Sequence, residues 1–160
     1  MSWSATEFKA LSSRAARGAG APPWQAEMFG AAAVQHLLAE EPIDVLDAAL
    51  AALPEGPVLQ IASLLLALQG RPGAPIELTE NLPVALVRSY AASQSYSLVI
   101  DTETGTATAF IGIPRRPVIG RIEAPDAFIS SLKALAERTF VPESDQSRAA
   151  GAGAALSDND

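Results

Sequence analysis

The residues best suited to chemistry lie in a phrase of arginine, alanine and glycine that the chain contains twice. The first copy, residues 13–21, reads SRAARGAGA, and the second, residues 147–154, reads SRAAGAGA. Glycines at this spacing permit positive φ and a close backbone approach, while the neighbouring arginine carries a permanent planar charge that suits carboxylate or phosphate. This chemistry recognises anions without transforming them, so the phrase favours a binding role.

The second copy belongs to a polar tail, residues 141–160, which is the main candidate for a binding site. An arginine that follows a serine and precedes two glycines can present a guanidinium and free amides to an anion. The alternative is a disordered terminus, for which glycine and alanine are typical. The residues predicted to bind, from both copies and the chain end, are Arg14, Arg17, Ser147, Arg148, Gly151, Gly153, Asp158 and Asp160.

Two familiar ligand motifs do not fit the tail. A phosphate loop needs a preceding strand, a third glycine and a following lysine, all of which are missing around residues 151–153. A calcium loop needs a glycine turn and a bidentate carboxylate after the alternating acids of residues 158–160. We therefore expect solvated carboxylates at this end and no metal site.

His36 is the single histidine of the sequence, so it is the one imidazole that a hydrolytic triad could use as a base. It lies on a predicted helix that is apolar on most sides, where a lone histidine is more often structural. No serine lies in a nucleophile-elbow sequence, and zinc would need more imidazoles or thiolates than the chain has. These observations weaken hydrolase and metalloenzyme assignments.

Other groups of charged residues can be explained by structural roles as well as by binding roles. The Pro-Arg-Arg-Pro stretch at residues 114–117 is a compact cationic point that an acidic ligand or the tail could occupy. Its alternative role is that of a charged loop that discourages edge-to-edge pairing of strands. The acidic pair Glu40-Glu41 is expected at a helix end, and Asp101 with Glu103 in a hairpin turn.

Composition limits the classes of protein and partner. The 160 residues carry a formal net charge of −7 with a pI near 4.7, so we expect neither nucleic acid nor an anionic membrane as the partner. The sequence has no cysteine, which excludes disulfides, and residues 1–9 do not read as a secretory signal, so we expect a cytoplasmic protein. The longest apolar run, residues 61–68, is far short of the ~20 residues that cross a bilayer.

Five helices are predicted before any clear sheet. The first begins at the capping box of Ser4 and Glu7 and stops at Gly18 or Gly20. The second has two prolines in its first turn and apolar residues around most of its circumference, so it belongs in the middle of the molecule. Helical spacing of apolar residues places the second to fifth helices at residues 22–39, 43–53, 61–68 and 81–92, with a break at residues 54–57.

A small sheet and a last helix follow. Apolar and polar residues alternate from Ser95 to Phe110 around a turn, which predicts a β-hairpin, and β-branched residues predict a third strand at residues 117–122. A final helix begins at Pro125. We therefore predict an α+β fold: amino-terminal helices, a small antiparallel sheet and a carboxyl-terminal helix with a polar, glycine-rich tail. Residues 1–140 form one globular domain, and residues 141–160 form the tail, docked or disordered.

The two ends of the chain resemble an uncharacterised bacterial family classed as a domain of unknown function. Residues 140–160 match its closing signature, VPxSxxSRxxGAGA..DND, and residues 15–20 resemble its start. Between the ends the resemblance is weak, and Ala155 stands where a glycine is usual. The resemblance implies no activity, but it does imply that the tail is more than a random extension.

These observations favour a non-catalytic accessory or small subunit of a bacterial metabolic enzyme. Its tail would bind a protein partner, a second copy of the chain or an anionic small molecule, with Arg148 paired to the anionic group. No cofactor follows from the sequence. The alternative is a small cytoplasmic enzyme for a carboxylated metabolite, in which arginines of both copies hold the substrate while His36 or Asp158 moves a proton.

Overall fold

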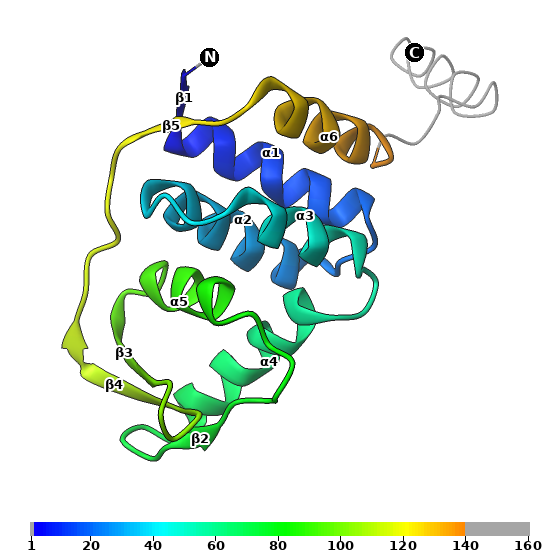
Figure 1. The fold of residues 1–160 in the computed structure, drawn as a ribbon. Helices are drawn as coiled ribbons and strands as arrows, with labels where there is room; N and C mark the ends of the chain where they lie inside the picture. Colours follow the sequence, from blue (N-terminus) through cyan, green and yellow to red (C-terminus); the bar gives the residue numbers. More distant parts are fainter. Residues whose placement is uncertain (1, 140–160) are drawn as a thin grey trace, which may run out of the picture.

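The computed structural model of the chain describes residues 2–139, in which helices are stacked on a small sheet (Figure 1). The predicted α+β class is confirmed for this part of the chain. In chain order its elements are β1 (Ser2–Ser4), α1 (Ala5–Gly18), α2 (Pro23–Leu38), α3 (Ile43–Ala51), α4 (Pro57–Gly70), β2 (Ile76–Glu77), α5 (Val84–Ala92), β3 (Tyr96–Asp101), β4 (Thr106–Pro114), β5 (Arg121–Glu123) and α6 (Asp126–Glu137).

Helix α1 begins at the predicted capping box. The Ser4 hydroxyl accepts a hydrogen bond from the Glu7 amide at 3.2 Å, and the Ser4 amide donates to the Glu7 carboxylate at 3.0 Å. These bonds satisfy two amides that a helix start otherwise leaves unpaired. Hydrogen bonds from the hydroxyl and amide of Ser4 also hold the pKa of the Glu7 carboxyl below its usual value.

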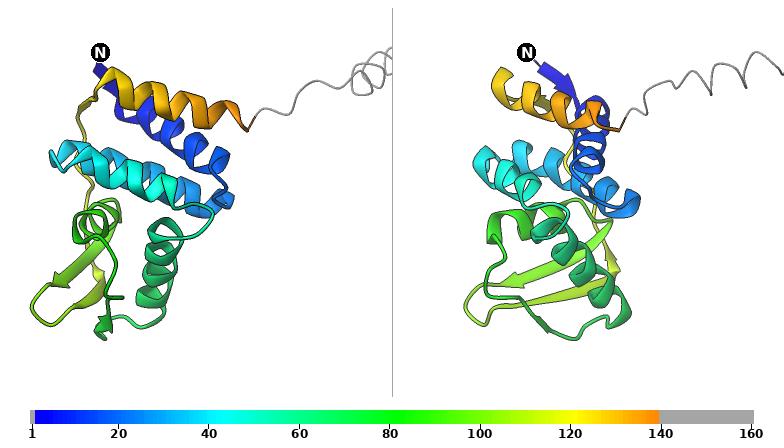
Figure 2. Two further views of the ribbon diagram at one scale, coloured as in Figure 1. Left: turned by 45° about the vertical axis from the view of Figure 1, so that its right-hand side comes forward. Right: turned by 90° about the vertical axis from the view of Figure 1, so that its right-hand side faces the viewer.

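Helices α1 and α6 lie side by side and run in the same direction, as the left view of Figure 2 shows. Near their beginnings, the rings of Phe8 and Phe128 have centroids 6.5 Å apart. Near their ends, a Cβ at Gly18 would collide with the carbonyl oxygen of Leu135. Glycine at this position therefore allows the two backbones to approach closely.

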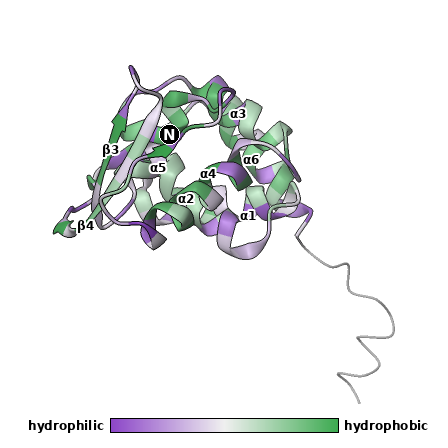
Figure 3. Cartoon of the chain, turned by 90° about the horizontal axis from the view of Figure 1, so that it is seen from below, coloured by the Kyte–Doolittle hydropathy of each residue, from purple (hydrophilic) through white to green (hydrophobic). Residues whose placement is uncertain are grey.

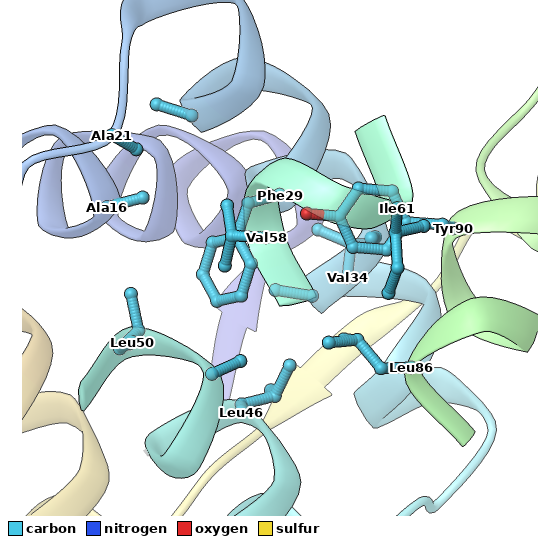
Figure 4. Close-up of a cluster of buried hydrophobic side chains, with 14 of the residues drawn as sticks. Ala16, Ala21, Phe29, Val34, Leu46, Leu50, Val58, Ile61, Leu86 and Tyr90 are labelled. Carbon is cyan, nitrogen blue, oxygen red and sulfur yellow. The ribbon is translucent and has the colours of Figure 1, made fainter. Parts of the chain in front are cut away.

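Helix α2 is central, as predicted. It packs against α1 on one side and α5 on the other, and it also contacts α4 and β5. Figure 4 shows its Phe29 beside Val58 of α4, within a buried apolar cluster that also holds Ile61 and Tyr90 of α4 and α5. A helix with neighbours on most sides needs apolar residues on most sides, which explains the composition of α2.

Strands β3 and β4 form the predicted hairpin, and β2 pairs with the other edge of β4 to give the order β2-β4-β3. At the turn, the Asp101 carboxylate accepts hydrogen bonds from the Thr104 amide at 3.1 Å and the Glu103 amide at 2.9 Å. These bonds, the one from Thr104 first, keep the pKa of Asp101 below its ordinary value. Asp101 and Glu103 thus belong to a turn, as expected.

The prediction of a third strand at residues 117–122 is wrong in its bounds and in its partner. The strand in this region is β5, Arg121–Glu123, which pairs antiparallel with β1 and forms a separate two-stranded sheet. Pro114 and Pro117 have no amide hydrogen to donate to a neighbouring strand, so the chain leaves the hairpin before it can form another ladder. Strands β1 and β2 have two or three residues each, too few for a periodic pattern, and were not predicted.

Candidate functional site

Arg14 and Arg17, the predicted binding residues of the first arginine phrase, are exposed on α1. Arg14 lines a groove between α1 and α6 together with Trp3 and Lys133, and its Nε donates to the Ala10 carbonyl at 3.4 Å. Arg17 lies in the last turn of α1, where a cation compensates the negative end of the helix dipole. No other residue of the predicted binding set lies within residues 2–139.

The glycines of the first phrase have structural roles. Gly20 has a φ of +111° and follows the C-cap Ala19. The Gly20 amide donates to the Arg17 carbonyl at 3.0 Å and the Ala21 amide to the Ala16 carbonyl at 2.9 Å, which is the Schellman arrangement that ends many helices. With Gly18 packed on α6, both glycines of this copy are explained by helix ending and helix packing rather than by a ligand.

The remaining predicted binding residues lie outside the described residues, so the tail hypothesis stays a prediction. They are Ser147, Arg148, Gly151, Gly153, Asp158 and Asp160.

His36 is completely buried and hydrogen-bonded through both ring nitrogens. Its Nε2 lies 2.9 Å from the carbonyl oxygen of Pro42, which can only accept, so this nitrogen carries a proton. Its Nδ1 lies 2.8 Å from the hydroxyl of Ser89, which also lies 2.9 Å from the Ala85 carbonyl. The imidazole thus joins α2, α5 and the residue ahead of α3, and a ring without exposed surface gives no support to a role as proton carrier for a substrate.

An exposed apolar surface begins in the second strand of the hairpin and continues beyond it, and sequence reasoning did not identify it. Nine large apolar side chains are exposed within residues 2–139, and five of them lie in residues 110–119. We call residues 110–119 the apolar segment. Its five large apolar side chains, with their exposed fractions, are Phe110 (38%), Ile111 (44%), Ile113 (56%), Val118 (61%) and Ile119 (91%).

The apolar segment runs along one side of the molecule from β4 to β5 (Figure 1), and Figure 3 shows hydrophobic residues on β3 and β4. Two contacts hold its backbone. The Arg115 amide donates to the Ser95 carbonyl at 2.8 Å. The buried amide side chain of Gln35 donates to the Val118 carbonyl at 2.9 Å and accepts from the Val118 amide at 3.2 Å. The exposed side chains therefore stand on a backbone that is fixed at two points.

One edge of β4 is free over the same residues. Strand β2 pairs only with Thr106 and Ala107 of β4, and the Gly73 amide adds one hydrogen bond to the Ala109 carbonyl at 2.8 Å. Beyond Ala109, no described residue pairs with this edge. Backbone groups on a free edge are open to pairing with another chain.

A signal for this surface is present in the sequence. The segment reads FIGIPRRPVI, in which β-branched residues flank two prolines. Pro114 and Pro117 prevent a regular ladder beyond the end of β4, so the side chains that follow cannot alternate between a core and solvent as they would in a paired strand. Apolar residues around an interrupting Pro-Arg-Arg-Pro were thus a reason to expect exposure rather than a third strand.

Among residues 2–139, no group of three histidine, aspartate or glutamate side chains is placed to hold a metal ion. In the same part of the chain, no helix has both the length and the apolar character needed to cross a bilayer.

Comparison with known proteins gives no relative from which a function could be inferred. No family model, no curated protein and no solved structure matches the chain.

Proposed function

We propose that this chain is a non-catalytic accessory subunit of a metabolic enzyme and that it binds its partner protein through the apolar segment. The observation that carries the proposal is the gathering of five exposed large apolar side chains on ten consecutive residues. Contiguous exposed apolar surface is unfavourable in water and marks interaction sites in folded proteins. Backbone contacts to Gln35 and Ser95 hold the segment in place before a partner arrives, which lowers the entropic cost of binding.

The side chains of the apolar segment indicate which features its partner should have. Isoleucine and valine side chains favour an apolar surface, and the free edge of β4 at residues 110–113 can accept a short added strand. Arg116 is exposed and lies within 4 Å of no carboxylate oxygen among residues 2–139. We therefore expect the partner to present apolar residues together with a carboxylate that faces Arg116.

A second copy of the chain fits this surface less well than a different protein. A two-fold interface would bring the same segment from each copy together, so two Arg115-Arg116 pairs would meet in one contact. Residues 110–119 contain no aspartate or glutamate to offset these charges. Two copies of a chain with a net charge of −7 also repel one another as whole molecules.

The test is a binding measurement with a purified partner. The full chain is tagged and recovered from the cells that naturally produce it, the co-purifying protein is identified and purified, and its Kd is measured by calorimetry. We expect the triple variant Ile113→Thr, Val118→Thr, Ile119→Thr to bind about tenfold or more weakly, because it loses apolar contact area while keeping β-branched shape. Arg116→Gln should weaken binding less, because a rim charge contributes little.

The matched control is Leu66→Gln on α4, where an exposed leucine (58%) lies apart from the segment in sequence. Equal weakening by Leu66→Gln and by the triple variant would contradict the proposal. So would a dimer of the purified chain, seen by light scattering, that the triple variant abolishes, because the occupant would then be a second copy.

The tail hypothesis has its own variant in the same assay. Arg148→Gln removes the single cation of residues 140–160. If the tail also contacts the partner, this change weakens binding while the triple variant of the segment retains its separate effect.

A further inference from the structure

A cleft on the other side of Arg115 has the features of a site for an anionic small molecule. It has a volume of about 350 Å³ and lies between the end of α2, helix α5 and strand β3. Sites for small ligands in proteins are typically ~300–1,000 Å³. The lining residues that matter here are Gln35, Glu41, Arg88, Ser89, Leu98 and Arg115.

The charges around this cleft are unusual for so acidic a chain. Arg88 and Arg115 both line it, against the single carboxylate of Glu41. Within residues 2–139, neither guanidinium lies within 4 Å of a carboxylate oxygen or donates a hydrogen bond to another residue. The ion pair in this part of the chain joins Lys9 to Glu27. Two guanidiniums that form no ion pair within the described residues, against one carboxylate, make this cleft attractive to an anion.

The backbone that carries both arginines is held in place from behind. Arg88 stands on α5 next to Ser89, which is 3% exposed and whose hydroxyl contacts buried His36 at 2.8 Å. Arg115 follows β4, and its amide donates to the Ser95 carbonyl at 2.8 Å. Anchored backbones reduce the ordering that a ligand would otherwise have to impose.

The geometry points to a binding site in which Arg88 and Arg115 hold the carboxylate or phosphate group of a small molecule. Guanidinium forks match both groups and can donate two parallel hydrogen bonds to either. Leu98 and Ile100 of β3 give the cleft an apolar wall for the remainder of the molecule. Arg115 belongs to the apolar segment, but the proposed partner surface uses the apolar side chains of that segment and Arg116, whereas the cleft uses the Arg115 side chain.

The experiment titrates the full chain with inorganic phosphate and, separately, with succinate, and follows binding by calorimetry and by amide NMR shifts. We expect saturable binding of at least one probe, which identifies the preferred group. Arg88→Gln and Arg115→Gln should each weaken it about tenfold or more, because each removes charged hydrogen bonds. Glu41→Gln should strengthen it several-fold, because it removes the one repelling charge in the cleft.

Arg116→Gln is the matched control, since it removes the same charge from the next residue, which does not line the cleft. It should change anion affinity by less than about twofold, because this charge does not line the cleft and acts on a ligand there only through screening solvent. Equal effects of Arg115→Gln and Arg116→Gln would overturn the inference, because binding would then follow net charge alone. Absence of saturable binding of both probes would overturn it as well.

A further experiment distinguishes two possible occupants of the cleft: a free anion and the carboxylates of Asp158 and Asp160. Asp158→Asn with Asp160→Asn in the full chain should leave affinity for the probes unchanged. Tighter binding by this double variant would assign the cleft to those carboxylates and would overturn the small-molecule site. Circular dichroism and thermal unfolding of each variant verify that the fold is intact.

Discussion

Two regions of the molecule use their small and apolar residues in opposite ways. Where α1 meets α2 and α6, glycines let backbones touch: a Cβ at Gly30 would collide with Ser13 and the Lys9 carbonyl, and one at Gly18 with the Leu135 carbonyl. Along the apolar segment, Gly112 has no atom within 4 Å of its Cβ position, and its apolar neighbours face solvent. In the first region, the packing surfaces are already covered by other parts of the chain. In the second region, the apolar side chains have no covering element among the described residues.

This difference separates stability from function. A surface that is buried against other elements of the fold is not accessible to a partner, so substitutions there change the free energy of unfolding. A surface that is held in place but exposed contributes little to the stability of the fold. Substitutions there should change the affinity for a partner instead. Three predictions test this division, beginning with the largest expected effect.

Gly30→Ala should destabilise the protein by about 3 kcal/mol, the upper end for overpacking, because the colliding atoms include a backbone carbonyl that cannot rotate away. Gly112→Ala should change stability by less than about 0.5 kcal/mol. Urea unfolding followed by circular dichroism measures both. Similar losses of unfolding free energy for the two variants would contradict the proposed difference between the packed region and the apolar segment.

Ser89→Ala should cost about 2 kcal/mol, because it leaves the buried Nδ1 of His36 without a partner at the junction of α2 and α5. The control is Ser93→Ala, at the C-cap of the same helix. The Ser93 hydroxyl donates to the Tyr90 carbonyl at 2.7 Å and accepts from the Gln94 side-chain amide at 3.0 Å, and the residue is partly exposed, so water can replace it. We expect a smaller loss there, in the same urea measurement. If Ser89→Ala were neutral, His36 would not hold this junction together.

Tyr90→Phe should raise stability by about 1 kcal/mol. The Tyr90 hydroxyl is buried without a hydrogen-bond partner among residues 2–139, and burial raises the pKa of this phenol above its ordinary value. Removing an unsatisfied buried hydroxyl relieves its desolvation cost. Tyr96→Phe is the control, because the Tyr96 hydroxyl accepts from the Gln69 amide at 3.0 Å.

Calorimetric melting temperatures of the two phenylalanine variants provide the readout. A gain for Tyr90→Phe and a loss for Tyr96→Phe support the assignment. A loss for both would show that the Tyr90 hydroxyl has a partner in solution, and the packed region would then contain an unrecognised polar contact.

Much of the helical architecture could be predicted because its causes are local. The capping box at Ser4 and Glu7 fixes the start of α1, and Gly20 fixes its end through a backbone conformation that glycine adopts without strain. Helices α2, α3 and α6 begin within one residue of their predicted starts, because prolines and apolar spacing mark them in the sequence. Helix α4 begins four residues before its predicted stripe, and α5 begins three residues after its predicted start. The hairpin turn at Asp101 followed from the same kind of local signal.

The functional surfaces could not be predicted in the same way. Whether Ile113 and Ile119 are buried depends on whether another element covers them, and no local pattern contains that information. Likewise, Arg88 and Arg115 are 27 positions apart in the sequence, and only the packing of α5 beside β3 brings them to one cleft. The Pro-Arg-Arg-Pro motif marks Arg115 and Arg116 in the sequence, but no local pattern indicates that Arg88 lies near Arg115.

By itself, the sequence determined the local elements, the acidic net charge and the central place of α2, because propensity, capping and apolar periodicity act between residues a few positions apart. Tertiary structure alone decided that Gly18 serves a helix contact, that His36 is enclosed and that residues 110–119 remain uncovered. Each of these depends on contacts between segments distant in the chain, and such contacts are set by how all the elements pack at once.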